Sequence, residues 1–273
     1  MTFALILPYF NGIIFLMENV LIVENLSVSA YFFRSTEKIV DGVSFCLGEG
    51  ERLAIVGESG SGKSMIVNAI TSSLADNCFA LGKILFNGDD LLSKKGKKYL
   101  GKEIVFVPQG GAESLNPCLK IKTQIYEALP KEKRKLSREE KRAYALHNLE
   151  RAGLKNGEEI LEKYPFEVSG GEAQRVVLAI AMCVKPTLIV ADEMTRGIDR
   201  EAIDVFWDCI DRDFATSSLI VVTHDMSVAS RCDKVLVLKE GKLQEYGKTE
   251  EVFLSPKNEY TKSLILASES SYA

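Results

Sequence analysis

GESGSGKS, at residues 57–64, matches in full the phosphate-binding loop pattern G-x-x-x-x-G-K-[S/T]. An apolar run at residues 52–56 (RLAIV) precedes the loop and predicts a buried strand, and a helix is predicted to begin near Lys63. Glycines let consecutive backbone N–H groups turn toward phosphate oxygens, and a helix N-terminus adds partial positive charge. This order of strand, loop and helix predicts an α/β domain that binds a nucleoside phosphate.

Every residue of the loop is a candidate nucleotide ligand. In loops of this pattern the lysine, here Lys63, reaches the β- and γ-phosphates, and the serine hydroxyl, here Ser64, binds Mg²⁺. The alternative is a chance turn rich in glycine and serine, which would not need a strand before it and a helix after it. The residues assigned to the nucleotide are Gly57, Glu58, Ser59, Gly60, Ser61, Gly62, Lys63 and Ser64.

Two adjacent acids, Asp192 and Glu193, follow a second apolar run at residues 187–191 (TLIVA). In an open parallel sheet, ligands bind at the carboxyl ends of the strands, where such side chains gather. We therefore expect Asp192 to bind Mg²⁺ and Glu193 to polarise an attacking water. The alternative, a plain surface turn, is disfavoured by the phosphate loop. Together these elements predict a P-loop nucleoside triphosphatase and nothing narrower.

Short apolar runs alternate with longer helical stretches over residues 17–256, which predicts an α/β fold with a mostly parallel sheet covered by helices. The runs at residues 52–56, 187–191 and 218–223 are the expected central strands. Residues 18–29 predict a first strand, and residues 233–246 predict an edge hairpin that turns at Glu240-Gly241. Antiparallel strands are expected at the N-terminus and the edge.

A charged, helical stretch interrupts this pattern over residues 110–185 and predicts an inserted helical subdomain. Ser137 and Glu140 have the spacing of a capping box, and Gly153 ends the helix that they begin. Residues 257–273 form a tail with one short amphipathic helix. The ATPase domain is thus expected to span residues 17–256, between an extra apolar segment at residues 1–16 and this tail.

Composition limits the classes of protein that this chain can belong to. Its 273 residues have a net charge of −4 and a pI near 5.5, whereas nucleic-acid-binding domains have a pI above about 9. A lysine-rich run at residues 94–102 is predicted to be a solvated loop. The six cysteines are scattered without C-x-x-C spacing, which predicts reduced, mostly buried thiols.

The N-terminal segment at residues 2–17 (TFALILPYFNGIIFLM) is apolar, but Pro8, Asn11 and Gly12 interrupt it. A membrane-spanning helix needs about 20 apolar residues, and a secretory signal needs a positively charged start. The favoured interpretation is that translation begins at Met17. The alternative is an arm that contacts the membrane surface.

A second candidate anion site lies in VSGGEAQR, at residues 168–175, which is followed by an apolar helix. Ser169 is a suitable N-cap, and Gly170 and Gly171 allow close approach of a ligand to the backbone. The stretch resembles the LSGGQ signature of ABC transporter ATPases. That resemblance implies an ABC ATPase fold in which two ATPase domains enclose two ATP molecules head to tail, so that each signature completes the other domain's site.

Further motifs of this family occur in the family's order. Gln109 in FVPQG resembles the Q-loop glutamine, which senses Mg²⁺ and the membrane partner, and Asp199 in TRGID resembles the D-loop aspartate. His224 in VVTHD resembles the switch histidine that contacts the γ-phosphate. The resemblance therefore implies catalytic roles for Glu193, His224 and Lys63, metal ligation by Ser64, Gln109 and Asp192, and ATP with Mg²⁺ as the bound species.

Two features of the resemblance stay open. The family stacks adenine on an aromatic side chain before the phosphate loop, and Tyr31, Phe32 and Phe33 all qualify, with Tyr31 and Phe33 taken as candidates. The signature has Glu172 where the family has glutamine. Because a carboxylate there would repel phosphate, we expect Glu172 to point away, and the second ATPase subunit is expected to be a non-identical chain.

Two stretches resemble the peptide and nickel importer ATPases, namely residues 113–129 (ESLNPCLKIKTQIYEAL) and residues 256–266 (PKNEYTKSLIL). The resemblance implies a subunit on the cytoplasmic face of the membrane, partnered by two permease subunits and an extracytoplasmic substrate-binding protein. Oligopeptides, dipeptides, nickel and metal chelates all remain possible cargo. No cysteine follows Cys232, so no iron–sulfur site is expected. The competing class, ABC proteins that act on nucleic acid or ribosomes, has long coiled coils or tandem ATPase units, which this sequence lacks.

Overall fold

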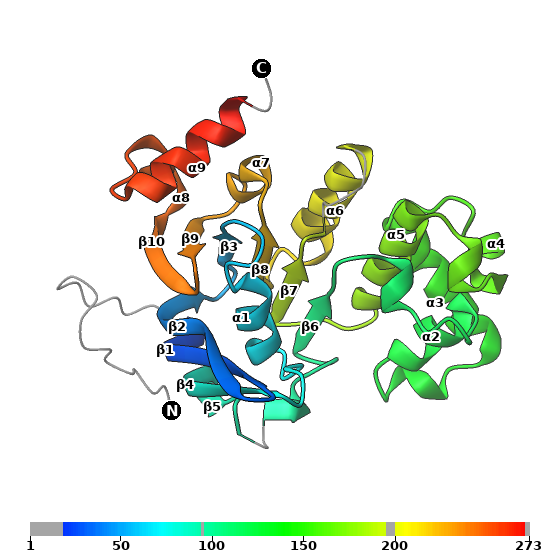
Figure 1. Cartoon of the computed structure of the whole chain (residues 1–273). Coiled ribbons are helices and arrows are strands. Elements are labelled where there is room, and N and C mark those ends of the chain that lie inside the picture. The colour runs from blue at the N-terminus through cyan, green and yellow to red at the C-terminus, as the bar shows by residue number, and fades with distance from the viewer. Residues whose placement is uncertain (1–18, 94–95, 195–199, 271–273) are drawn as a thin grey trace.

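The computed structural model describes residues 19–93, 96–194 and 200–270. Its strands belong to two sheets, and helices α2–α5 form a separate lobe on one side (Figure 1). The predicted α/β class, with a mostly parallel sheet and antiparallel N-terminal and edge strands, is confirmed by this arrangement.

The first sheet is antiparallel, with strand order β2-β1-β4-β5. The predicted first strand is longer than expected, because it pairs with β2 along its whole length and extends to Phe32. The strands are β1 (Asn19–Phe32), β2 (Ser35–Gly48), β4 (Cys78–Phe86) and β5 (Asp89–Asp90).

The second sheet has strand order β10-β9-β3-β8-β7-β6 and is parallel except for the β9–β10 hairpin. Apolar runs form its central strands, as predicted, although β7 begins one residue later than expected and includes Asp192. The strands are β3 (Arg52–Val56), β6 (Ile104–Val107), β7 (Leu188–Asp192), β8 (Ser218–Thr223), β9 (Lys234–Lys239) and β10 (Lys242–Lys248).

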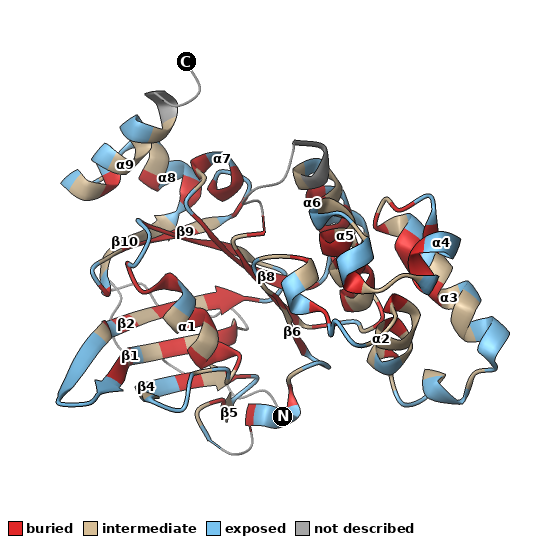
Figure 2. Cartoon of the chain, turned by 45° about the vertical axis from the view of Figure 1, so that its right-hand side comes forward, coloured by how far each residue is buried: buried red, intermediate tan, exposed pale blue. Residues whose placement is uncertain are grey.

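Helix α1 (Lys63–Ile70) packs against the antiparallel sheet and β7, and its buried side chains join the apolar cluster between the two sheets (Figure 2). The other helices outside the lobe are α6 (Arg200–Asp213), α7 (Met226–Ala229), α8 (Thr249–Leu254) and α9 (Glu259–Ser270). None of the helices in the described ranges is long and apolar enough to cross a bilayer.

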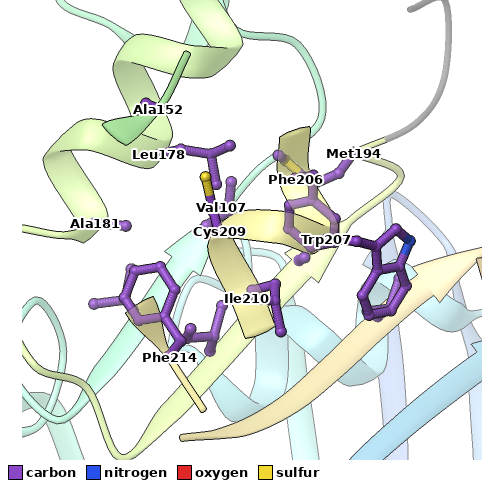
Figure 3. Close-up of a cluster of buried hydrophobic side chains, with 14 of the residues drawn as sticks. Val107, Ala152, Leu178, Ala181, Met194, Phe206, Trp207, Cys209, Ile210 and Phe214 are labelled. Carbon is purple, nitrogen blue, oxygen red and sulfur yellow. The ribbon is translucent and has the colours of Figure 1, made fainter. Parts of the chain in front are cut away.

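The lobe contains α2 (Ile121–Ala128), α3 (Arg138–Arg151), α4 (Gly157–Glu162) and α5 (Gly170–Ala181), with short 3₁₀ turns η2 (Ala112–Ser114), η3 (Lys133–Lys135) and η4 (Pro165–Glu167). The capping box predicted at Ser137 and Glu140 is present at the start of α3. A second apolar cluster, made of lobe and sheet residues, joins Leu178 of α5 and Val107 of β6 to Phe206 of α6 (Figure 3).

The cysteines differ in part from the prediction of mostly buried thiols. All six are free, but only Cys183, Cys209 and Cys232 are buried, whereas Cys118 is exposed.

Within the lysine-rich run, Lys98 lies in a 3₁₀ turn, η1 (Gly96–Lys98), and its ammonium pairs with Asp89 at 2.7 Å.

Candidate functional site

The phosphate loop connects β3 to α1, and neighbouring backbone leaves no room for a side chain at two of its glycines. A Cβ at Gly57 would lie 2.1 Å from the Leu238 carbonyl oxygen, and one at Gly62 would lie 3.0 Å from the Ile39 carbonyl oxygen. Gly62 is also the N-cap of α1, at φ +102, and no side chain caps this helix. The first N–H groups of α1 are therefore available to a bound anion.

Lys63 is 5% exposed and is the first residue of α1. Its ammonium donates to the carbonyl oxygens of Gly57 and Glu58, both at 2.8 Å. Burial lowers the pKa of Lys63, although the carboxylates of Glu193 and Asp192 partly oppose this shift. A phosphate group would supply the negative charge that the ammonium lacks at contact distance among the described residues.

Asp192, at the end of β7, is 8% exposed, and its Oδ1 atom has no hydrogen-bond partner among the described residues. Burial raises the pKa of this carboxyl, while a hydrogen bond with the Ser64 side chain and the charge of Lys63 lower it. A buried carboxylate oxygen without a partner is costly unless a ligand completes it. A hydroxyl and a carboxylate are hard oxygen donors of the kind that Mg²⁺ prefers, so this pair fits the predicted ion.

Glu193 has φ +44, a backbone conformation that is strained for a residue with a side chain. Its N–H donates to the Val222 carbonyl oxygen at 2.9 Å, which ties it to β8. His224 follows β8, and its Nδ1 lies 3.6 Å from Oε1 of Glu193. The glutamate side chain is 11% exposed and the histidine side chain 55%, so a water or phosphate can reach both.

Lys63, Ser64 and Glu193 line a cavity of 290 Å³, which the exposed Gln109, from the loop after β6, also lines. Asp192 and His224 lie beside Glu193. The structure thus brings together most of the phosphate, metal and catalytic residues that the sequence predicted. Ile39, which was not predicted, also borders the cavity. The residues that line it are Ile39, Ser59, Gly60, Gly62, Lys63, Ser64, Met65, Gln109 and Glu193.

The signature residues form a second helix start, away from this cavity. Ser169 caps α5, and a Cβ at Gly170 or Gly171 would meet nothing within 4 Å. None of the three residues lines the cavity around Lys63, and Figure 1 shows α5 within the helical lobe. The chain therefore presents two separate helix N-termini to anions.

The orientation predicted for Glu172 is wrong. Its carboxylate turns back and accepts the N–H of Ser169 at 2.9 Å, which completes a capping box instead of pointing away from the helix start. This bond lowers the pKa of the Glu172 carboxyl. A capping box satisfies two N–H groups that the helix leaves unpaired, which explains why the side chain folds back.

The candidate aromatic residues lie where β1 turns into β2, and none of them lines the cavity. Tyr31 stacks on Phe79 with ring centroids 4.9 Å apart, whereas Phe33 is 97% exposed. Phe32 is also half-exposed. Asp199 lies outside the described residues.

Sequence reasoning missed three contributors to this site. The carbonyl oxygens of Ile39 and Leu238 press on the loop, and no local pattern marks them because any residue has a carbonyl. Gln174, within the signature stretch, donates to the Met194 carbonyl oxygen beside Glu193 at 3.1 Å. Its position in a motif was a signal, although no role was predicted for it.

Comparison with known proteins now adds to this geometry. A family model described as ABC transporter matches residues 40–196. The oligopeptide transport ATP-binding protein of Bacillus subtilis is 37% identical over 89% of this chain and 70% of its own length. The metal-staphylopine import system ATP-binding protein of Staphylococcus aureus is 35% identical over 84% of this chain and 86% of its own length.

Solved structures agree with these sequence matches. A dimeric ATP-binding cassette in a post-hydrolysis state with ADP and Pi has a TM-score of 0.74 and 25% identity, over 84% of this chain and 98% of that one. A component of a Clostridium perfringens ABC transporter complex has a TM-score of 0.70 and 26% identity, over 87% of this chain and 92% of that one.

Proposed function

From the premise that this chain belongs to the family of ABC transporter ATP-binding subunits, we propose that it hydrolyses ATP to power the import of peptides or of metal–chelator complexes. The observation behind the catalytic part is that a buried lysine and a glutamate line one cavity, while an aspartate oxygen without a partner among the described residues and a histidine lie beside that glutamate. The cargo classes come from the peptide and metal-chelate importers that the chain resembles over most of its length.

In the proposed reaction, the loop N–H groups and the Lys63 ammonium bind the β- and γ-phosphates and stabilise the charge that moves onto the leaving group. Mg²⁺, when bound to Ser64 and Asp192, would neutralise phosphate charge. Gln109 is the third proposed metal ligand. An aromatic side chain of the β1–β2 turn, Tyr31 or Phe33, is proposed to stack on adenine.

Glu193 is the proposed general base. Its side chain is partly exposed to the cavity, so that it can orient a water and accept the water's proton as the oxygen attacks the γ-phosphate. His224, whose Nδ1 lies 3.6 Å from Oε1 of that carboxylate, is proposed to contact the γ-phosphate. A glutamate with strained backbone geometry is typical of a functional position, because such strain persists only where the surroundings impose it.

The separate helix start at Ser169, Gly170 and Gly171 supports a site that is completed across a dimer. One ATP molecule needs one such cradle, and this chain has two that do not meet. The proposed partners are a second, non-identical ATPase subunit, two membrane permeases and an extracytoplasmic binding protein. The chain would then lie at the cytoplasmic face of the membrane.

Action on nucleic acid is the competing function, and two observations argue against it. The chain is acidic overall, and the relatives that it resembles are transport subunits.

The test is Glu193→Gln, assayed in the full chain together with its partner subunits. Loss of a general base should slow ATP hydrolysis about 10²- to 10⁴-fold, while nucleotide binding persists and an ATP-bound dimer accumulates on size exclusion. Glu250→Gln, on the exposed first turn of α8, is the matched control and should hydrolyse ATP normally. Near-normal turnover in Glu193→Gln would remove this residue from catalysis.

Cargo is tested separately, in cells that carry Lys63→Ala. Loss of labelled oligopeptide uptake would support a peptide importer, and loss of nickel–chelate uptake with normal peptide uptake would support a metal importer. Unchanged uptake of both would refute the proposed transport role.

A further inference from the structure

Gln174 is a buried polar residue that the mechanism above does not use. It lies in the second turn of α5, is 6% exposed, and is the α5 side chain that bonds to the strand end beside the catalytic glutamate. Its Nε2 donates to the Met194 carbonyl oxygen at 3.1 Å, across a buried interface. Met194 follows Glu193 directly, so this bond acts on the peptide unit that follows Met194, one residue beyond the proposed general base.

Glu193 needs such support because its backbone is strained. At φ +44 it occupies a conformation that is strained for a residue with a side chain. Its own N–H is fixed by the Val222 carbonyl oxygen on one side. The Gln174 amide fixes the carbonyl of the next residue on the other side, and the Met194 side chain is buried in the apolar cluster shared by α5 and α6 (Figure 3).

The same turn of α5 also supports the loop of Gln109. A Cβ at Gly111 would lie 2.3 Å from the backbone nitrogen of Gln174, so the segment after Gln109 packs directly on the helix backbone at this residue. The start of α5, at Ser169, lies five residues earlier, which is about 7.5 Å along the helix axis. The start of α5, which carries the signature, therefore contacts both the loop of Gln109 and the segment of Glu193 and Met194 after β7.

We propose that Gln174 is a positioning residue for hydrolysis: its amide couples the placement of Glu193 to the placement of the signature helix. The inference rests on the proposed function, in which that helix caps ATP bound by the partner subunit. When the partner's nucleotide draws the start of α5 into place, the amide transmits this placement to Glu193. The chain's own site then becomes competent only when the partner's site is filled.

The first test is Gln174→Met, which keeps the length and burial of the side chain and removes the amide. Because Oε1 of Gln174 has no partner among the described residues, its removal offsets part of the lost hydrogen bond, and the fold should persist. We expect kcat to fall at least tenfold, because small displacements of a catalytic group are costly, while ATP affinity stays within threefold. Gln124→Met is the control, since among the described residues that amide bonds within the helical lobe: it donates to the Asn116 and Leu119 carbonyls and accepts the Asn116 N–H.

Hydrogen exchange of the full chain gives a readout independent of activity. In Gln174→Met the amides of residues 193 and 194 should exchange about fivefold faster, as for the loss of one hydrogen bond, with exchange of the β3 and β8 amides unchanged. Faster exchange throughout the sheet and α5, or no change at residues 193 and 194, would show that Gln174 stabilises packing without positioning Glu193.

The second test is Gln174→Glu, which keeps the shape of the side chain. Only its protonated carboxyl can donate to the Met194 carbonyl oxygen, and burial favours that protonated form. The kcat of Gln174→Glu, divided by the kcat of the wild type at the same pH, should therefore rise as pH is lowered from 8 to 6. A ratio independent of pH would overturn the proposal. If the wild type itself fails to hydrolyse ATP with its partners, the proposed function is wrong, whereas normal hydrolysis in both variants refutes only the role of Gln174.

Discussion

Replacing Gly57 with alanine tests how far tertiary packing dictates the phosphate loop. The added Cβ would lie 2.1 Å from the Leu238 carbonyl oxygen and 2.9 Å from Oγ of Ser61. The first contact involves backbone at the end of β9, which no side-chain rotation can relieve. Either the loop or β9 must retreat by about 1 Å to restore ordinary packing distance.

The expected loss of stability has two parts. Overpacking of this kind costs about 1–3 kcal/mol, and the backbone conformation at φ +152 adds about 1–2 kcal/mol for a residue with a Cβ. For a chain of this size 1 kcal/mol lowers Tm by roughly 2–4 °C, so we expect a decrease of about 5–15 °C. ATP affinity should fall as well, because the Gly57 carbonyl oxygen is a partner of the Lys63 ammonium.

Gly88→Ala is the matched control for Gly57→Ala. Gly88 also has a positive φ, +84, but a Cβ there would meet nothing within 4 Å. Gly88→Ala should lower Tm only by the conformational contribution, about 2–8 °C, and should leave ATP affinity unchanged. Differential scanning fluorimetry with and without ATP and Mg²⁺ measures both quantities. Equal Tm losses and equal ATP affinities in the two variants would refute the assignment of the effect to contact with Leu238.

Three further predictions concern the charged groups and the start of the chain. ATP at about 100 times its Kd should stabilise the wild type by roughly 2.7 kcal/mol, and Lys63→Ala should abolish this ATP-dependent rise in Tm; a rise that persists would contradict the assigned phosphate site. Burial raises the pKa of Asp192, so its charged form weakens the nucleotide-free fold above the ordinary aspartate value near 3.9, and this cost disappears as pH falls below that value. Without nucleotide at pH 7, Asp192→Asn should therefore have a higher Tm than the wild type, and this difference in Tm should narrow toward pH 4. The variant should also lose stabilisation by ATP and Mg²⁺. A difference in Tm that stays constant with pH would show that desolvation of the carboxylate is not the cause. A chain that begins at Met17 should keep its solubility and its ATPase activity, since no motif precedes that residue, and loss of either property would assign a role to residues 1–16.

Local sequence patterns were sufficient to predict the principal elements of the fold. The phosphate loop, the buried apolar strands and the capping box at Ser137 and Glu140 each depend on residues close together in the chain. Their spacing imposes backbone geometry directly, through glycine conformations, strand burial and helix capping. The grouping of Lys63, Gln109 and Glu193 in one cavity could also be foreseen, because parallel strands place their carboxyl ends at one edge.

The predictions were weaker where side chains choose between nearby partners. Glu172 had to be placed without knowledge of its hydrogen bonds, and the reasoning from phosphate repulsion overlooked the free N–H of Ser169. Tyr31 similarly finds Phe79 on β4, a contact that depends on the pairing of β1 with β4.

The sequence by itself therefore determined which chemical groups are present and on which elements they lie: a phosphate-binding loop, an acid pair after a strand and a second anion-binding helix start. The tertiary structure alone decided how these groups act on one another. It presses the Leu238 carbonyl against Gly57, leaves one oxygen of Asp192 without a partner among the described residues, and joins the Gln174 amide to Met194 beside the strained Glu193. The physical reason is that such contacts join residues far apart in the chain, and their distances are set by strand register and helix packing rather than by any local pattern.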